Sequence, residues 1–98
     1  IAAGEEWRRI GPVFEEIGRD GGLPPLSVDT GKAEVAGRAL AAGASIVNDV
    51  WGLQRDPAMA PLVAGRGVPV IVMHNRDVAD PDLDIMADVL AFLARSVA

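Results

Sequence analysis

The residues Gly43-Ala44-Ser45-Ile46-Val47-Asn48-Asp49-Val50 carry the clearest structural signals in this chain. They begin with a glycine, the residue that most often ends a helix, and continue into a short apolar run. Two polar residues, Asn48 and Asp49, follow that run directly. This order predicts a helix that ends at Gly43, a buried strand over residues 45–47 and a polar group at the carboxyl end of the strand.

Two further apolar runs, one on each side of this stretch, are also predicted strands. Residues 26–28 follow a pair of prolines that keep the chain extended, and residues 68–73 contain only apolar side chains. Around the strands, apolar residues recur at intervals of three and four, which predicts four helices. Strands that alternate with helices indicate parallel β/α units, because a parallel pair needs a crossover connection. Since the strands lack polar alternation, we expect cover on both faces, as in a barrel or a doubly wound sheet.

Local signals predict where the helices begin and end. The first helix covers residues 5–18, and Pro12 should kink or divide it. Its expected stop signals are Gly18, Gly21 and Gly22. The other three helices open at residues that can cap a helix: Asp29 or Thr30, Asp56, and Asp80. Their expected ends are Gly43, Gly65 or Gly67, and the turn that holds Arg95.

Composition excludes several classes of protein. Half of the 98 residues are hydrophobic and 23% are charged, which is typical of one soluble globular domain. The net charge of −5 disfavours nucleic acid and anionic membranes as partners, and no apolar stretch approaches the roughly 20 residues of a membrane span. One histidine and no cysteine leave no metal site and suit a reducing cytoplasm. Because the chain does not begin with methionine, we expect it to be a stretch of a longer polypeptide.

Each predicted strand delivers polar residues just past its carboxyl end. They are Asp29 after the first strand, Asn48 and Asp49 after the second, and His74, Asn75 and Arg76 after the third. The carboxyl ends of neighbouring parallel strands share one edge, where such proteins bind ligands, so one pocket can draw on all three. Structural roles stay open: a helix cap for Asp29, a turn for Asn48 and Asp49, and a structural hydrogen bond for His74.

Three motifs carry a resemblance to a known family. Ser27-Val28-Asp29-Thr30, Ile46-Val47-Asn48-Asp49-Val50 and Val72-Met73-His74 have the order and spacing found in dihydropteroate synthases, and the chain resembles that family over almost its whole length. The resemblance implies part of a (β/α)₈ TIM barrel, with residues 1–98 as a partial pterin-binding domain without internal boundary. It also implies a transferase of folate biosynthesis, which condenses 6-hydroxymethyl-7,8-dihydropterin diphosphate with p-aminobenzoate and releases pyrophosphate.

The resemblance implies roles for single residues. Asp29 and Asn48 would line the pterin pocket, because a carboxylate and a carboxamide can pair with the donors and acceptors of a pterin edge. Asp29 would also stabilise positive charge as pyrophosphate departs. Val50 and Met73 would be apolar walls against the ring.

His74 and Arg76 are implied contacts to an anion or to a loop. Here the family pattern is least closely followed, because Met-His continues as Asn75-Arg76-Asp77.

Further implications concern cofactor and partners. The intact family enzyme uses Mg²⁺ held by segments that this chain lacks, so we expect no metal bound by these 98 residues. The intact enzyme is implied to be a cytoplasmic homodimer without nucleic-acid or membrane partners, and the isolated chain is expected to be inactive. Two alternatives stay open: a methyltetrahydrofolate-dependent pterin-binding methyltransferase domain, and a non-catalytic half-barrel that binds pterin or self-associates.

Overall fold

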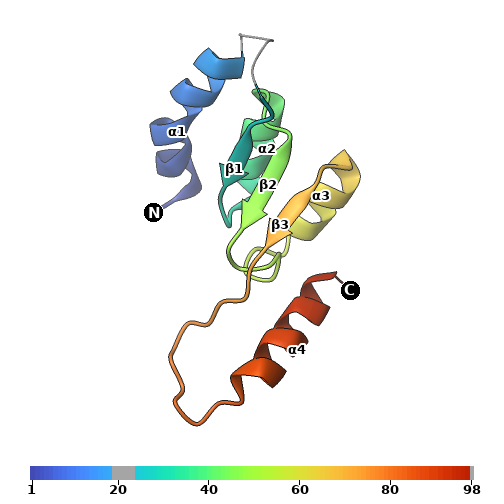
Figure 1. Ribbon diagram of the computed structural model, residues 1–98. Coiled ribbons are helices and arrows are strands. Elements are labelled where there is room, and N and C mark those ends of the chain that lie inside the picture. The colour runs from blue at the N-terminus through green and yellow to red at the C-terminus, as the bar shows by residue number, and fades with distance from the viewer. Residues whose placement is uncertain (19–23, 98) are drawn as a thin grey trace.

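The computed structural model describes residues 1–18 and 24–97. Within these residues, helices and strands alternate in the predicted order, with four helices and three strands (Figure 1). The elements are α1 (Ala3–Gly18), β1 (Ser27–Asp29), α2 (Ala33–Ala41), β2 (Ile46–Asp49), α3 (Met59–Arg66), β3 (Val70–Val72) and α4 (Ile85–Val97). The predicted stop signals Gly21 and Gly22 lie outside the described residues.

The three strands form one parallel sheet in the order β1-β2-β3. Val28 pairs with Val47, which pairs with Val70, so a row of valines crosses the sheet. The prediction of parallel β/α units is confirmed, because each strand returns to the sheet through a helix.

The hydrophobic core lies on one face of this sheet. Val28 and Val47 are buried there against α2 and α3, and apolar side chains of α1 pack on the same cluster. The opposite face is open, with Asp29 exposed and Ile71 53% exposed. The expected cover on both faces is therefore wrong for residues 1–18 and 24–97, since all the packing against the core comes from one side.

Three predicted helix starts are wrong. Helix α3 begins at Met59, not at Asp56, and Ala58 at its N-cap makes no side-chain capping bond. Helix α2 begins at Ala33, not at a cap formed by Asp29 or Thr30, and Lys32 at its N-cap makes no side-chain capping bond. Helix α4 begins at Ile85 instead of near Asp80, because Asp80 forms a local turn by accepting the N–H of Asp82. The first predicted helix is continuous through Pro12.

Asp56 accepts backbone N–H groups next to the starts of two helices. Its Oδ2 accepts the N–H of Ala33 at 2.8 Å and its Oδ1 accepts the N–H of Ala58 at 2.9 Å. These bonds, first that from Ala33, hold the pKa of Asp56 below its ordinary value. The residue predicted to open α3 therefore also satisfies the first turn of α2, which lies 23 positions earlier in the chain.

We expect Asp56→Ala to lower the free energy of unfolding by about 1–3 kcal/mol, because the N–H groups of Ala33 and Ala58 both lose their acceptor. A carboxylate with a lowered pKa stabilises the fold above its unfolded pKa of about 4, and this stabilisation is lost as the pH falls through the folded value. The difference between the wild type and Asp56→Asn should therefore shrink below about pH 4. Urea denaturation at pH 7 and pH 3 checks this, and Glu15→Gln, a substitution at an exposed carboxylate, is the control. Equal stabilities of the wild type and the two Asp56 variants at pH 7 would contradict the prediction.

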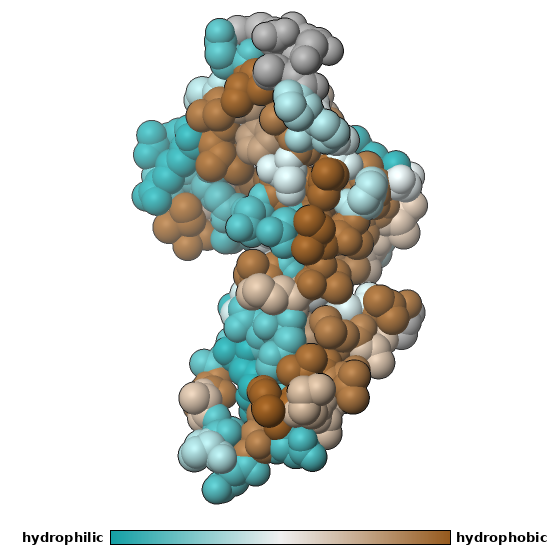
Figure 2. Space-filling view, in the orientation of Figure 1, coloured by the Kyte–Doolittle hydropathy of each residue, from teal (hydrophilic) through white to brown (hydrophobic). Residues whose placement is uncertain are grey.

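Helix α4 contacts the rest of the chain through the loop after β2. Gln54 Nε2 donates to Phe92 O at 2.7 Å and to Ser96 Oγ at 2.9 Å. Gly52 permits this approach, because a Cβ there would lie 2.5 Å from Ser96 Oγ and 2.6 Å from Phe92 Cε1. Apolar side chains gather along the rest of α4 and are exposed (Figure 2). Among the described residues, no helix is both long and apolar enough to span a membrane.

Candidate functional site

The open face of the sheet brings two of the predicted site residues side by side. Asp29 pairs with Asn48 in the register of β1 and β2, and Asn48 pairs with Ile71 of β3. Neighbours in register point to the same face of a sheet. The pairing continues past the strand end, where Thr30 N donates to Asn48 O at 3.1 Å. A carboxylate and a carboxamide thus stand next to each other at the carboxyl edge of the sheet.

A cavity of about 520 Å³ opens beside this edge, between α1 and the loops that follow β1 and β2. Asp29 and Val50 both line it, and charged side chains of Glu6, Lys32 and Arg55 surround it. The structure therefore unites the predicted carboxylate with one of the two predicted apolar walls. A cavity of this size is in the range of small-molecule sites.

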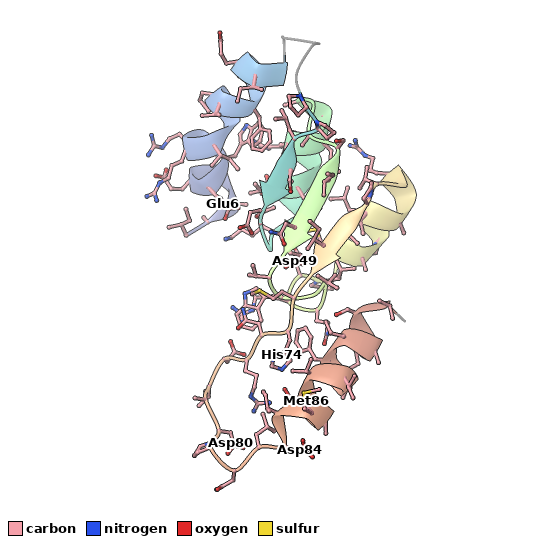
Figure 3. All side chains as sticks on the ribbon, in the orientation of Figure 1. Glu6, Asp49, His74, Asp80, Asp84 and Met86 are labelled. Carbon is pink, nitrogen blue, oxygen red and sulfur yellow. The ribbon has the colours of Figure 1, made fainter. Side chains whose placement is uncertain are left out.

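Glu6 of α1 holds the segment that follows Asp29. One carboxylate oxygen accepts the hydroxyl of Thr30, and the other accepts Lys32 Nζ at 2.8 Å (Figure 3). Burial raises the pKa of Glu6, but the hydrogen bonds from Lys32 and Thr30 outweigh it and leave that pKa below its ordinary value. Sequence reasoning missed Glu6, because nothing local to α1 indicates a partner 24 residues away.

Asp49 has a different role from its neighbour Asn48. Its side chain is completely buried, and it accepts the N–H groups of Trp51 at 2.9 Å and Leu53 at 3.0 Å. Leu53 has a φ of 66°, a conformation that is rare outside glycine, so the loop needs this support. The turn role left open for the pair applies to Asp49, whereas Asn48 faces the open side of the sheet.

The residues after β3 turn toward α4. His74 Nε2 donates to Asp88 Oδ2 at 2.5 Å, and the His74 ring stands edge-on to Phe92 with centroids 5.2 Å apart (Figure 3). Arg76 Nη1 donates to the other oxygen of Asp88 at 3.0 Å. The hydrogen bond from His74, helped by Arg76 and opposed by burial, lowers the pKa of Asp88. Met73, which directly follows β3, remains 46% exposed.

A second cavity of about 450 Å³ lies between the loops after β2 and β3 and helix α4. Arg55 lines both cavities, with its guanidinium carbon 3.5 Å from the centroid of the Trp51 ring. Arg55 also pairs with Asp77 and so links the two loops. Arg76 lines this second cavity, away from Asp29.

The chain is similar to proteins of one family. All of residues 1–98 match the family model described as "Pterin binding enzyme". The chain is 45% identical to the dihydropteroate synthase of Bacillus subtilis (strain 168) over 97 residues, which are 99% of this chain and 33% of that protein. It is 42% identical to the Mycobacterium leprae dihydropteroate synthase, with 95% of this chain and 36% of that protein covered. The chain thus spans about a third of the length of the curated relatives that it matches.

Comparison with solved structures leads to the same family. The chain matches a dihydropteroate synthase of Clostridium difficile, solved in the presence of pteroic acid, with a TM-score of 0.90 and 39% identity, covering 99% of this chain and 36% of that one. It matches the Xanthomonas albilineans dihydropteroate synthase in complex with 7,8-dihydropteroate with a TM-score of 0.83 and 40% identity, covering 99% and 36%. These likenesses confirm the predicted fold class, that of parallel β/α units from a TIM barrel.

Proposed function

The chain belongs to the pterin-binding enzyme family, and on that premise we propose that the protein is a dihydropteroate synthase of folate biosynthesis, a transferase. The observation that carries this proposal is the pairing of Asp29 with Asn48 on the open face of the sheet. A carboxylate beside a carboxamide offers acceptors and donors together, which is what the edge of a pterin ring requires. Relatives solved with pteroic acid and with dihydropteroate support a pterin as the ligand.

The proposed reaction joins two small molecules. The amine nitrogen of p-aminobenzoate forms a bond to the methylene carbon of the dihydropterin diphosphate, the bond from that carbon to the diphosphate oxygen breaks, and pyrophosphate leaves with the electron pair while the amine loses a proton. Asp29 accepts hydrogen bonds from the pterin and stabilises the positive charge that develops as pyrophosphate departs. A Xanthomonas albilineans relative solved with 4-aminobenzoic acid supports the second substrate.

Apolar contacts complete the proposed pterin site. Val50 lines the same cavity as Asp29, and Val50 and Met73 each follow directly after the last register pair of β2 and β3, Asp49 with Val72. We assign both to the walls against the pterin ring. For His74 and Arg76 the bonds to Asp88 favour a loop contact over contact with an anion.

Cofactor, compartment and assembly follow the same proposal. From the family resemblance, we propose that Mg²⁺ serves the reaction and is held by segments that these 98 residues do not include. Within residues 1–18 and 24–97, no three His, Cys, Asp or Glu side chains gather into a metal site. We also propose a cytoplasmic homodimer that binds neither nucleic acid nor membrane. The lack of cysteine supports the compartment, the net charge of −5 supports the absence of polyanionic partners, and the homodimer follows from the family resemblance alone.

We expect the complete enzyme to release pyrophosphate only when dihydropterin diphosphate and p-aminobenzoate are both present. The 98-residue chain by itself should show no turnover, because the face of its sheet that carries Asp29 and Asn48 is open. Pyrophosphate release by both forms checks this, with methyltetrahydrofolate and a methyl acceptor as the control reaction. Methyl transfer without pyrophosphate release would contradict the proposal, and turnover by the 98 residues alone would contradict the second expectation.

A further inference from the structure

We propose that Asp88 is a positioning residue for the pterin site: by binding His74 and Arg76 together, it fixes the segment after β3 and thereby the wall formed by Met73. This inference rests on the proposed function, and it concerns a residue of α4 that does not line the cavity of Asp29.

Side chains, not backbone pairing, hold the segment after β3. Within the described part of the chain, residues 74–79 make no hydrogen bond to another backbone group through their own backbone. The segment is attached through His74 and Arg76 to Asp88, and through Asp77 to Arg55. Of these anchors, Asp88 alone takes two side chains, one on each carboxylate oxygen.

The Asp88 anchor is more sheltered than an ordinary surface ion pair. The side chain of Asp88 is 20% exposed and that of His74 is 18% exposed, with the ring edge of His74 against Phe92. The other ion pair of the segment, between Arg55 and Asp77, has side chains that are 49% and 75% exposed. Exposed pairs contribute little to holding a conformation, so the Asp88 anchor should dominate.

Met73 lies next to this anchor and has few constraints of its own. Its side chain is 46% exposed, and β3 has already ended at Val72. Its carbonyl oxygen approaches Gly52, where a Cβ would lie 3.3 Å away, and its other neighbour is His74. When His74 loses Asp88, the peptide after Met73 is free to move, and the apolar wall moves with it.

The test is calorimetric binding of dihydropterin diphosphate to the complete enzyme. We expect Asp88→Asn to weaken the Kd for this compound about tenfold, because small displacements of a positioning contact are costly. The KM for p-aminobenzoate should stay within twofold of the wild type. Asp88→Glu keeps both acceptor oxygens and should recover most of the affinity. Asp82→Asn removes the same charge from the exposed loop before α4 and serves as the matched control, with an unchanged Kd.

A double variant separates positioning from a general loss of structure. If Asp88 acts through His74, then His74→Gln and Asp88→Asn together should weaken pterin binding no more than the stronger single variant. The inference would be overturned if Asp88→Asn had the same Kd as Asp82→Asn. It would also be overturned if the loss of affinity in the double variant equalled the product of the losses in the two single variants. Equal losses for both substrates would also overturn it, because they indicate a structural role.

Failure of the proposed function gives a different result. Since binding is measured without turnover, a wild type that binds the pterin diphosphate but forms no dihydropteroate contradicts the reaction and leaves the comparison of Asp88 variants decisive. A wild type that does not bind the compound overturns both.

Discussion

Replacing Asp29 by alanine should lower kcat/KM of the complete enzyme for dihydropterin diphosphate by about 10²–10³-fold, the effect of losing a charged hydrogen-bond partner at the reacting centre. Asn48→Ala should weaken the same step by a similar factor, because it removes the adjacent carboxamide from the same row. Steady-state kinetics with both substrates varied would measure these losses.

Stability should be nearly unchanged in the Asp29 variant. Asp29 is exposed, and its carboxylate has no hydrogen-bond partner among the described residues, so its removal leaves no buried group unpaired. Ser27→Ala provides a matched control, since Ser27 is an exposed residue two positions earlier on the same strand. Full activity in both Asp29→Ala and Asn48→Ala would show that the two residues have no part in the reaction.

Asp49, the neighbour of Asn48 in β2, should affect stability more than activity. Asp49→Ala should lower the free energy of unfolding by about 2–4 kcal/mol, because the N–H groups of Trp51 and Leu53 lose their common buried acceptor. Asp49→Asn keeps one carbonyl acceptor, so its free energy of unfolding should lie between those of the wild type and Asp49→Ala. Urea denaturation of the complete enzyme measures the loss, and kcat per folded molecule should fall less than in Asn48→Ala.

The adjacent pair Asn48 and Asp49 is therefore its own control. Asn48→Ala should reduce activity at nearly constant stability, whereas Asp49→Ala should mainly reduce stability. An Asp49→Ala protein as stable as Asn48→Ala would contradict the structural role given to Asp49. The contrast has a simple origin, because successive residues of a strand point to opposite faces and only one face of this sheet is covered.

Much of the fold was predictable because the signals for it are local. Apolar runs, glycine stops and three-to-four spacing indicate strands and helices whatever lies elsewhere in the chain, and alternation of the two makes the strands parallel. From there it follows that Asp29 and Asn48 share one edge of the sheet. The resemblance in three motifs, later confirmed by the family match over residues 1–98, led to the same edge.

The helix starts and the side-chain contacts between distant residues were not predictable in this way. The acceptor at the start of α2 is Asp56, the partner of Thr30 and Lys32 is Glu6, and the partner of His74 is Asp88. Each of these pairs joins residues 14 to 26 positions apart, and carboxylates are common enough that their presence singles out no partner.

The order of elements, the parallel sheet and the edge at which polar residues meet are thus encoded locally, since they depend on neighbours along the chain. Packing between distant segments instead covers the sheet on one face, buries Asp49 while Asn48 faces the open side, and brings Asp88 to the segment that follows Met73. These features depend on which helix packs against which face, and that is a property of distant segments brought together.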